Sequence, residues 1–265
     1  MNRSPSRGAL ALALLCPAAA AFADDAPGFD DEWHYTIGAA AVNYPKYSGS
    51  DETRTRAAPL INVTYGRWFL GGAPGGGAQG GLGAFLHRDE NFSYGVALSG
   101  GLFEPRKESD DPRLRGLGDV DRTVRAGFFA TWTRAWFTLS GNVSADAGGK
   151  DQGVQFTLDA QGRWKAGDSL TLSAGPGFTW SDGEYMRTIY GIDAKQSAAS
   201  GYAPYRPSGG VEEIHFSVGA DYRLSPQWNL GARATASRLQ GDAKDSVIVR
   251  DENQNVFAMY AAYRF

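Results

Sequence analysis

The stretch EIHFSVGADYRL, residues 213–224, alternates polar and apolar side chains from end to end. Its odd positions, beginning with Glu213, carry charged or polar side chains or glycine, and its even positions, beginning with Ile214, are all apolar. Successive side chains of a β-strand point to opposite faces of the sheet. The stretch is therefore predicted to be a strand with one hydrated face and one apolar face.

The same alternation recurs in residues 153–165, 169–181 and 227–239. These segments are long enough to cross a bilayer as tilted strands, which takes about 9–11 residues, whereas strands of soluble proteins average about five or six. The pattern predicts an all-β protein, a transmembrane antiparallel up-and-down β-barrel of about 12 strands, within a range of about 10–14.

We expect strands near residues 33–42, 57–65, 67–73, 80–87, 92–103, 122–133, 136–147, 153–165, 169–181, 212–224, 227–239 and 255–265. The run GGAPGGGAQGG, residues 71–81, fits a loop or a kinked strand, which sets the range in strand number. With the amino end in the periplasm, the short turns all fall on the periplasmic side. The longer loops 43–56, 104–121, 182–211 and 240–254 then fall outside, the asymmetry that is typical of bacterial outer-membrane barrels.

The aromatic side chains separate this barrel from a soluble β-sandwich, which would also bury an apolar face. A sandwich core would place more aromatic residues in the middle of strands, whereas a barrel concentrates them in girdles at the lipid headgroups. Ten aromatic residues lie near strand ends, on or beside the apolar face: Trp33, Phe92, Tyr94, Trp132, Trp136, Phe137, Trp164, Phe178, Trp180 and Trp228. This placement favours the barrel.

The amino-terminal 23 residues have the layout of a secretory signal peptide. Basic Arg3 and Arg7 precede an apolar run, and the small-residue exit ends at Ala23. We expect residues 1–23 to be cleaved and residues 24–265 to form the barrel in the outer membrane of a Gram-negative bacterium. Removal of the two arginines from the 26 basic residues leaves 24 against 29 acidic ones. The mature chain therefore lacks the excess of basic residues that is typical of nucleic-acid-binding proteins. Cys16, the one cysteine, is lost with the signal, so disulfides and cysteine chemistry are not expected.

Only one pair of residues suggests catalysis. His215 and Ser217 are two apart on the hydrated face of one predicted strand, with Asp221 further along. Some outer-membrane lipid hydrolases carry a similar His-x-Ser pair, but an Asn usually follows their Ser, and Val218 stands here. We expect a hydrogen-bonded pair inside the barrel, and no enzyme.

Two further motifs have a structural interpretation. The glycine run has no following Lys-Ser or Lys-Thr and opens no helix, so a phosphate cradle is not expected. The carboxylates of Asp110, Asp111, Asp119 and Asp121 lack the ligand spacing of a calcium loop. We expect them to be solvated or paired with arginines, and we expect no metal or cofactor. The neighbouring basic residues are Arg113, Arg115 and Arg122.

The predicted interior carries both signs of charge, whereas a strongly selective pore usually shows one sign at its constriction. A narrow lumen bridged by ion pairs and water is expected. The interior charges are Arg125, Asp159, Arg163, Lys165, Asp221, Arg223 and Arg233.

The last strand places Phe257, Met259, Ala261, Tyr263 and Phe265 on one face. A terminal phenylalanine with an aromatic residue two positions earlier resembles the signal by which outer-membrane barrels are recognised for assembly. Tyr263 and Phe265 are therefore expected to contact the barrel assembly machinery.

The loops carry a family resemblance that extends over essentially the whole mature chain. The segments YPKYSGSD (44–51), DPRLRGLGDVD (111–121) and RLQGDAKDS (238–246), together with YGI (190–192), SGY (200–202) and YRF (263–265), resemble the MipA/OmpV family of outer-membrane proteins. The residues that match these loop motifs are Tyr44, Tyr47, Gly49, Ser50, Arg113, Arg115, Gly116, Gly118, Asp119, Asp121, Tyr190, Gly191, Asp242, Asp245 and Ser246.

The resemblance implies a barrel without known catalytic residues. The founding member is described as a scaffold that holds a murein lytic transglycosylase and a murein synthase together, while other members are similar to adhesins or porins linked to antibiotic response. We therefore expect a scaffold or interaction protein for murein-remodelling enzymes at the cell envelope. A narrow porin-like solute or antibiotic-related channel is the second interpretation, and a lipid-modifying hydrolase is the third. Outer-membrane lipids are expected around the barrel in each case.

The motif loops fall outside, whereas murein enzymes work in the periplasm, where the chain offers only short turns and residues 24–32. We expect the loops to fold inward and cap the lumen. Pairs between Arg113 or Arg115 and Asp119, Asp121 or Asp242 would hold them there.

Overall fold

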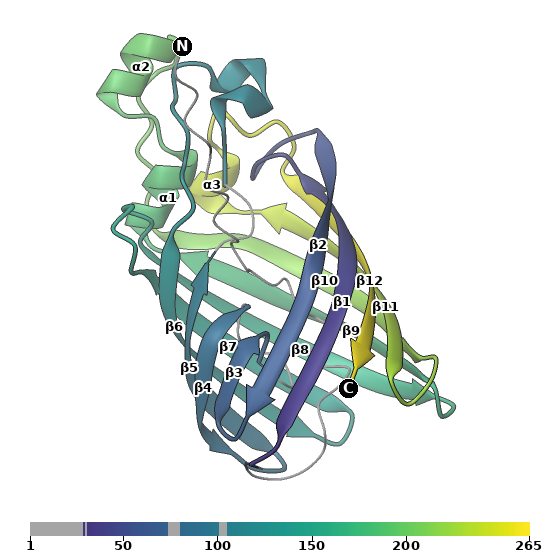
Figure 1. Ribbon diagram of the computed structural model, residues 1–265. Helices are drawn as coiled ribbons and strands as arrows, with labels where there is room; N and C mark the ends of the chain where they lie inside the picture. The colour runs from purple at the N-terminus through teal and green to yellow at the C-terminus, as the bar shows by residue number, and fades with distance from the viewer. Residues whose placement is uncertain (1–28, 30, 74–79, 101–104) are drawn as a thin grey trace, which may run out of the picture.

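The computed structural model describes residues 29, 31–73, 80–100 and 105–265 of the chain. Within these residues, twelve antiparallel strands close into one barrel, in which each strand pairs with its neighbours in sequence and β1 pairs with β12 (Figure 1). This confirms the up-and-down barrel and the strand number. The signal-peptide prediction, residues 1–23, lies outside the described residues, as do residues 74–79 of the glycine run.

The strands follow the alternating segments closely, with β2 longer and β3 shorter than expected. They are β1 (Trp33–Pro45), β2 (Thr53–Tyr65), β3 (Trp68–Gly71), β4 (Gly81–Arg88), β5 (Phe92–Gly100), β6 (Val124–Arg134), β7 (Phe137–Asp146), β8 (Val154–Ala166), β9 (Leu170–Ser181), β10 (Gly210–Arg223), β11 (Trp228–Leu239) and β12 (Asn253–Arg264). Within the described residues, no helix combines the length and apolar character that a membrane span requires.

The alternation in β10 separates the two faces of the wall as expected. The apolar Phe216 points outward and is 51% exposed, whereas the next residue, Ser217, points inward and is 7% exposed. Phe216 is opposite Pro176 of β9 and Ala236 of β11, so the apolar face continues across the neighbouring strands. A belt of apolar side chains facing outward is stable only against hydrocarbon, which places this barrel in the outer membrane.

The two ends of the barrel differ in the length of their connections. At one end, turns of a few residues join β2 to β3, β4 to β5, β6 to β7, β8 to β9 and β10 to β11. We call this end the rim, and by the usual asymmetry it faces the periplasm. The barrel's tryptophans other than Trp180 gather there. Trp33 begins β1 opposite Tyr65, beside the β2–β3 turn. The others lie at or within a few residues of these turns: Trp68, Trp132, Trp136, Trp164 and Trp228.

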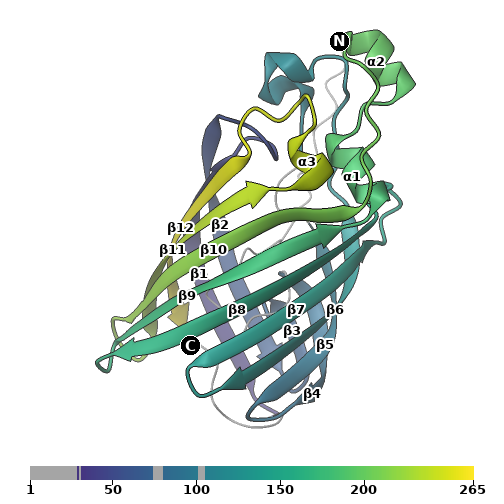
Figure 2. The ribbon, with the colours of Figure 1, turned by 180° about the vertical axis from the view of Figure 1, so that it is seen from behind.

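The other end carries a folded layer, which we call the crown. It consists of loop 1 (residues 46–52), loop 3 (105–123), loop 4 (147–153), loop 5 (182–209) and loop 6 (240–252). The sequence predicted loops 1, 3, 5 and 6 but not their helices, which stand over the barrel end in Figures 1 and 2. The helices are η2 (Glu108–Asp110), η3 (Pro112–Leu114), α1 (Gly183–Tyr190), α2 (Ala194–Ser200) and α3 (Gly241–Lys244).

The crown has an apolar core of its own. One cluster joins loops 3, 5 and 6 with the end of β11, and contains Val120, Met186, Ile189, Tyr190, Leu239 and Ala243. A second cluster joins loops 1, 3, 5 and 6, and contains Tyr47, Leu114, Leu117, Ile192 and Ile248. Because each cluster draws on several loops, burial of its apolar surface holds the loops to one another.

Candidate functional site

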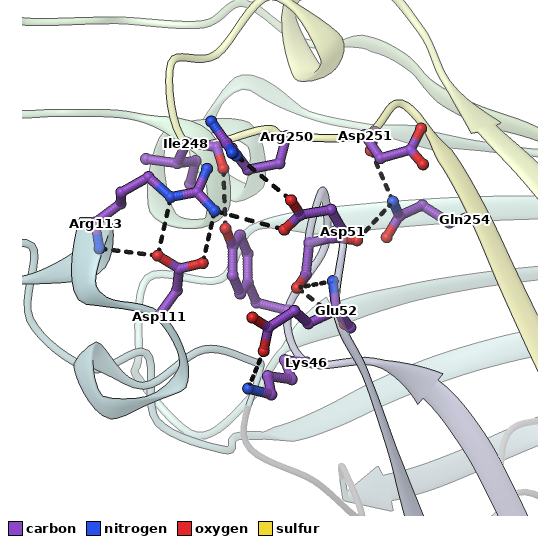
Figure 3. A network of polar contacts seen from close by, with 11 residues as sticks. Lys46, Asp51, Glu52, Asp111, Arg113, Ile248, Arg250, Asp251 and Gln254 are labelled. Atoms are coloured by element: carbon purple, nitrogen blue, oxygen red, sulfur yellow. Dashed lines mark hydrogen bonds and ion pairs between the residues drawn. The ribbon is translucent and has the colours of Figure 1, made fainter.

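The family-motif loops meet at a junction on the crown (Figure 3). The hydroxyl of Tyr47 in loop 1 donates a hydrogen bond to the backbone oxygen of Ile248 in loop 6, at 3.2 Å. Asp51 of loop 1 lies between two guanidinium groups. Its Oδ1 is 3.5 Å from Nη2 of Arg113 in loop 3, and its Oδ2 is 3.6 Å from Nε of Arg250 in loop 6. Three loops that are distant in sequence are therefore joined around one carboxylate.

Loop 1 needs glycine at its tip. Gly49 has a φ of +93°, and a Cβ there would lie 2.6 Å from Cγ2 of Val249 in loop 6. The close approach allows the backbone oxygen of Gly49 to accept from the amide of Arg250 at 2.7 Å. The amide of Gly49 donates to Oε1 of Gln254 at 3.1 Å, and Nε2 of Gln254 donates to the backbone oxygen of Ser50 at 3.3 Å. Residues of loop 1 and the start of β12 thus satisfy each other's polar groups.

Loop 3 is built around two further glycines and two carboxylates. Oε1 of Glu108 accepts from the amides of Gly116 and Gly118, at 3.0 and 2.7 Å. Oδ1 of Asp119 accepts from the amide of Glu108 at 2.8 Å. Both glycines have positive φ, +85° at Gly116 and +72° at Gly118, so their backbone suits glycine far better than other residues. The motif around residues 111–121 therefore specifies a loop shape.

Tyr190 lies at the centre of the crown and is fully buried. Its hydroxyl contacts Oγ of Ser48 at 2.6 Å and donates to Oε1 of Glu212 at 2.8 Å, while its backbone oxygen accepts from Oγ of Ser246 at 2.7 Å. Burial raises the pKa of Tyr190 well above its usual value. Gly191 follows as the C-cap of α1, with its amide bonded to the backbone oxygen of Arg187.

A buried arginine supports the same region. Arg106 is 2% exposed, and its Nη1 donates to the backbone oxygen of Ile189 at 2.9 Å. Burial lowers the pKa of Arg106, because the charged form is separated from water. Loop 3 is fixed to α1 through this contact.

Two pKa shifts at the junction follow from burial and from the ion pair. Burial raises the pKa of Tyr47 to about 12, and the carboxylate of Asp111 acts in the same direction. For Asp111 burial opposes ionisation, but hydrogen bonds from the amide and guanidinium of Arg113 outweigh it and lower its pKa. Nη2 of Arg113 lies 2.7 Å from Oδ2 of Asp111, and Nε lies 3.0 Å from Oδ1, so the pair is bidentate.

The predicted capping pairs were wrong in their partners. Arg113 pairs with Asp111 and Asp51, not with Asp119, Asp121 or Asp242. Arg115 is exposed, and within the described residues no ion pair joins it to those carboxylates. The three aspartates have other partners. Asp119 accepts from the amide of Glu108, Asp121 pairs with Nζ of Lys150 at 3.0 Å, and Asp242 accepts from the amide of Ser208 at 2.7 Å.

The predicted ion pairs of Arg113 and Arg115 do not form, because closeness in sequence does not fix the direction of a side chain in a loop. Pro112 and the N-cap at Asp111 turn η3 so that Arg113 folds back onto Asp111. Two other motif residues lie at the ends of secondary-structure elements. Tyr44 is near the crown end of β1, with the guanidinium of Arg54 5.7 Å from its ring centroid. Asp245 is the C-cap of α3.

The His215 and Ser217 pair does not form a catalytic unit. Nε2 of His215 lies 2.8 Å from Oδ1 of Asp159, whereas Oγ of Ser217 lies 2.8 Å from Oγ1 of Thr235. Each side chain is hydrogen-bonded inside the barrel, but to a different partner, so the histidine does not activate the serine. Within the described residues, no group of three His, Cys, Asp or Glu side chains is arranged to hold a metal ion.

Two of the predicted interior charges, Arg125 and Asp221, form hydrogen bonds with nearby polar groups. Arg125 donates from Nη1 to the backbone oxygen of Gln152 and from Nη2 to that of Ser144, each at 2.9 Å. Asp221 accepts from the hydroxyl of Tyr260. Both signs of charge are therefore present in the wall, and they are held in local networks.

Sequence reasoning missed the apolar side of the crown. Leu114, Leu117 and Val120 recur every third residue within a loop that is otherwise rich in charges, and all three are buried. That spacing was the available signal for a packed loop. At the rim, Tyr263 lies 4.9 Å from Phe265 and 5.2 Å from Trp228 between ring centroids. Their role as an assembly signal stays a prediction.

The fold and the crown define an outer-membrane β-barrel whose long loops form a packed layer of their own. The family model described as MltA-interacting protein MipA matches residues 37–265, and the chain belongs to this family. MltA-interacting protein of Escherichia coli K12 is 25% identical over 238 residues, with 88% of this chain and 91% of that protein covered. The putative outer membrane protein YiaT of the same organism is 26% identical over 233 residues, covering 87% and 90%. A solved outer membrane channel from Pseudomonas putida F1 is 12% identical at a TM-score of 0.49, covering 90% and 97%.

Proposed function

We propose that this protein is a non-enzymatic scaffold that holds murein-remodelling enzymes at the outer membrane. The observation that carries the proposal is family membership, joined to the name of a relative that describes interaction with MltA. His215 and Ser217 have different hydrogen-bond partners, so this pair gives no support to the alternative of a lipid hydrolase. The partners would be a murein lytic transglycosylase and a murein synthase.

The attachment face would be the rim, because it is the end that reaches the periplasm. Its turns present exposed polar side chains beyond the tryptophan girdle, among them Glu90, Asp168 and Gln227. Asp89 gives the β4–β5 turn a fixed shape, since its Oδ1 accepts from the amides of Asn91 and Phe92 at 2.8 and 2.7 Å. A fixed turn loses little conformational entropy when a partner binds.

Photocrosslinking in living cells tests which end meets a partner. A photoreactive residue placed at Glu90, Asp168 or Gln227 should form adducts that contain a lytic transglycosylase or a murein synthase. The same residue at Lys195 or Val247 of the crown should not, and these exposed positions serve as matched controls. If no murein enzyme is captured from the rim positions, or if the crown positions capture it equally, the scaffold proposal is wrong.

A narrow channel is the second candidate, and the hydrated, charged inner face of β8 and β10 favours it. Asp159 and His215 lie on this face, within the hydrogen-bonded networks described above. The packed crown opposes a permanently open pore, because it buries apolar clusters at the end of the barrel. Steady conductance of the unaltered protein in planar bilayers would favour the channel over the scaffold.

A further inference from the structure

A groove of about 710 Å³ crosses the outer surface of the wall from β8 to β12. These five strands are consecutive neighbours in the barrel and lie together in Figure 2. The side chains that line the groove and point outward are Leu158, Ala160, Pro176, Phe178, Ile214, Phe216, Ala236, Arg238, Asn253 and Asn255. The outside of a barrel is convex in general, so a hollow of this size is a local feature of this sequence.

Side-chain size explains the hollow. Phe216 is opposite Pro176 on one side and Ala236 on the other, so a large side chain stands between two small ones. In the neighbouring row, Ile214 is opposite Phe178, and these two large side chains form one side of the groove. The small residues leave space between the large ones, and nearly all of that space is bounded by apolar atoms.

The groove runs from the membrane surface into the hydrocarbon. The register joins Leu158, Phe178, Ile214, Arg238 and Asn253 into one row across the five strands. Arg238 is one residue from the end of β11 and Asn253 is the first residue of β12, both at the crown end. Leu158, by contrast, is four residues inside β8. One end of the row is polar and near the headgroups, and the other is apolar and deeper.

Arg238 gives the polar end a positive charge. Its side chain is 56% exposed, and Nη2 forms an ion pair with Oε1 of Glu252. A guanidinium has five N–H donors in a planar fork that matches phosphate oxygens, so further donors remain for a ligand. Asn253 and Asn255 add exposed amide groups beside it.

We propose that this groove binds a phosphorylated saccharolipid of the outer leaflet. An acyl chain would occupy the apolar part between Pro176 and Phe216, and a phosphate of the headgroup would contact Arg238. The crown end of the barrel faces outward, so the groove opens to the outer leaflet and not to the inner one. The site is independent of the proposed scaffold role, because it lies on the lipid-facing wall and not at the rim.

Native mass spectrometry of the full-length protein, extracted in mild detergent, tests the site. The unaltered protein should retain a phosphorylated saccharolipid. Ala236→Phe fills the groove and should reduce retention at least several-fold. Ala232→Phe, on the same strand and also exposed to lipid, lies outside the groove and should retain the lipid. Heat-modifiable migration on gels confirms that each variant is folded.

The charge of Arg238 is tested separately. Arg238→Gln should reduce retention, and Glu252→Gln, which frees the guanidinium from its carboxylate partner, should increase it. Retention of phospholipid alone, no retained lipid in the unaltered protein, or equal retention by Ala236→Phe and Ala232→Phe would each overturn the proposal.

Discussion

The rim and the crown are the two ends of one barrel, but different forces hold them. At the rim, short turns close hairpins whose backbone groups are already paired in the sheet, and aromatic side chains face the lipid headgroups. At the crown, loops 1, 3, 5 and 6 bury apolar side chains against one another, as a small soluble domain does. Because the crown buries apolar side chains of its own, we expect it to have a separate stability that can be lost while the wall stays closed.

Removal of the Tyr190 side chain should have the largest effect on this comparison. Tyr190→Ala deletes a fully buried ring and its contacts to Ser48 and Glu212. We expect a loss of about 3–5 kcal/mol in crown stability, as for other large buried aromatic residues. Limited proteolysis should cut the crown loops of the variant rapidly, while its heat-modifiable migration stays that of a closed barrel. The exposed crown variant Val247→Ala is the control, and simultaneous loss of the barrel in Tyr190→Ala would contradict independent stabilities.

Two glycines of loop 3 provide a matched pair for the next largest effect. Alanine at Gly116 or Gly118 incurs the cost of a left-handed backbone, about 1–2 kcal/mol in each case. At Gly116 a Cβ would also lie 2.8 Å from the backbone of Ala199 in α2, whereas nothing lies within 4 Å at Gly118. Gly116→Ala should therefore destabilise the crown by a further 1–3 kcal/mol or so. Hydrogen exchange of the α2 amides measures this additional destabilisation. Equal exchange in the two variants would show that loop 3 does not support α2.

The pKa of Tyr47 predicts a pH dependence of the crown. The folded pKa of about 12 exceeds the unfolded value of about 10, so the folded crown keeps a proton that the unfolded chain loses. The stability from this residue is fully present below pH 10 and falls by roughly 3 kcal/mol as the pH rises through 12.

Protease sensitivity of the crown should accordingly increase over this window. Tyr47→Phe should weaken the pH dependence, since it removes the ionisable group, and Tyr65→Phe at the rim should leave it unchanged. If the protease sensitivity of the crown changed with pH in the same way in the unaltered protein and in both variants, Tyr47 would not be the cause of the pH dependence.

The smallest effect is expected at the rim. Trp136 stacks on Trp164 with a centroid distance of 6.2 Å, and both rings are exposed to the membrane interface. Trp136→Ala should lower the barrel's unfolding free energy in lipid vesicles by about 0.5–1.5 kcal/mol. Crown proteolysis should not change. If the crown became more sensitive to protease instead, the two ends would be coupled through the wall.

The local sequence pattern predicted the strands of the barrel well and the contacts of the candidate site poorly. The alternation of residues 213–224 predicted strand β10 because alternation is a local property, whereas its register with β9 and β11 came from the structure. Arg113 was assigned the wrong partners because its direction depends on the turn at Asp111 and Pro112. The groove around Pro176 was also unforeseen, since it depends on which side chains meet across five strands.

The amino-acid pattern alone was enough to predict that this chain closes into a barrel in the outer membrane. A period of two along segments of bilayer length, with aromatic residues near the strand ends, favours a membrane barrel over a soluble sandwich. The arrangement of the crown, by contrast, depends on tertiary contacts. Its contacts join residues as distant as Tyr47 and Ile248, which are 201 positions apart, and loop backbones have no periodicity from which such meetings can be read.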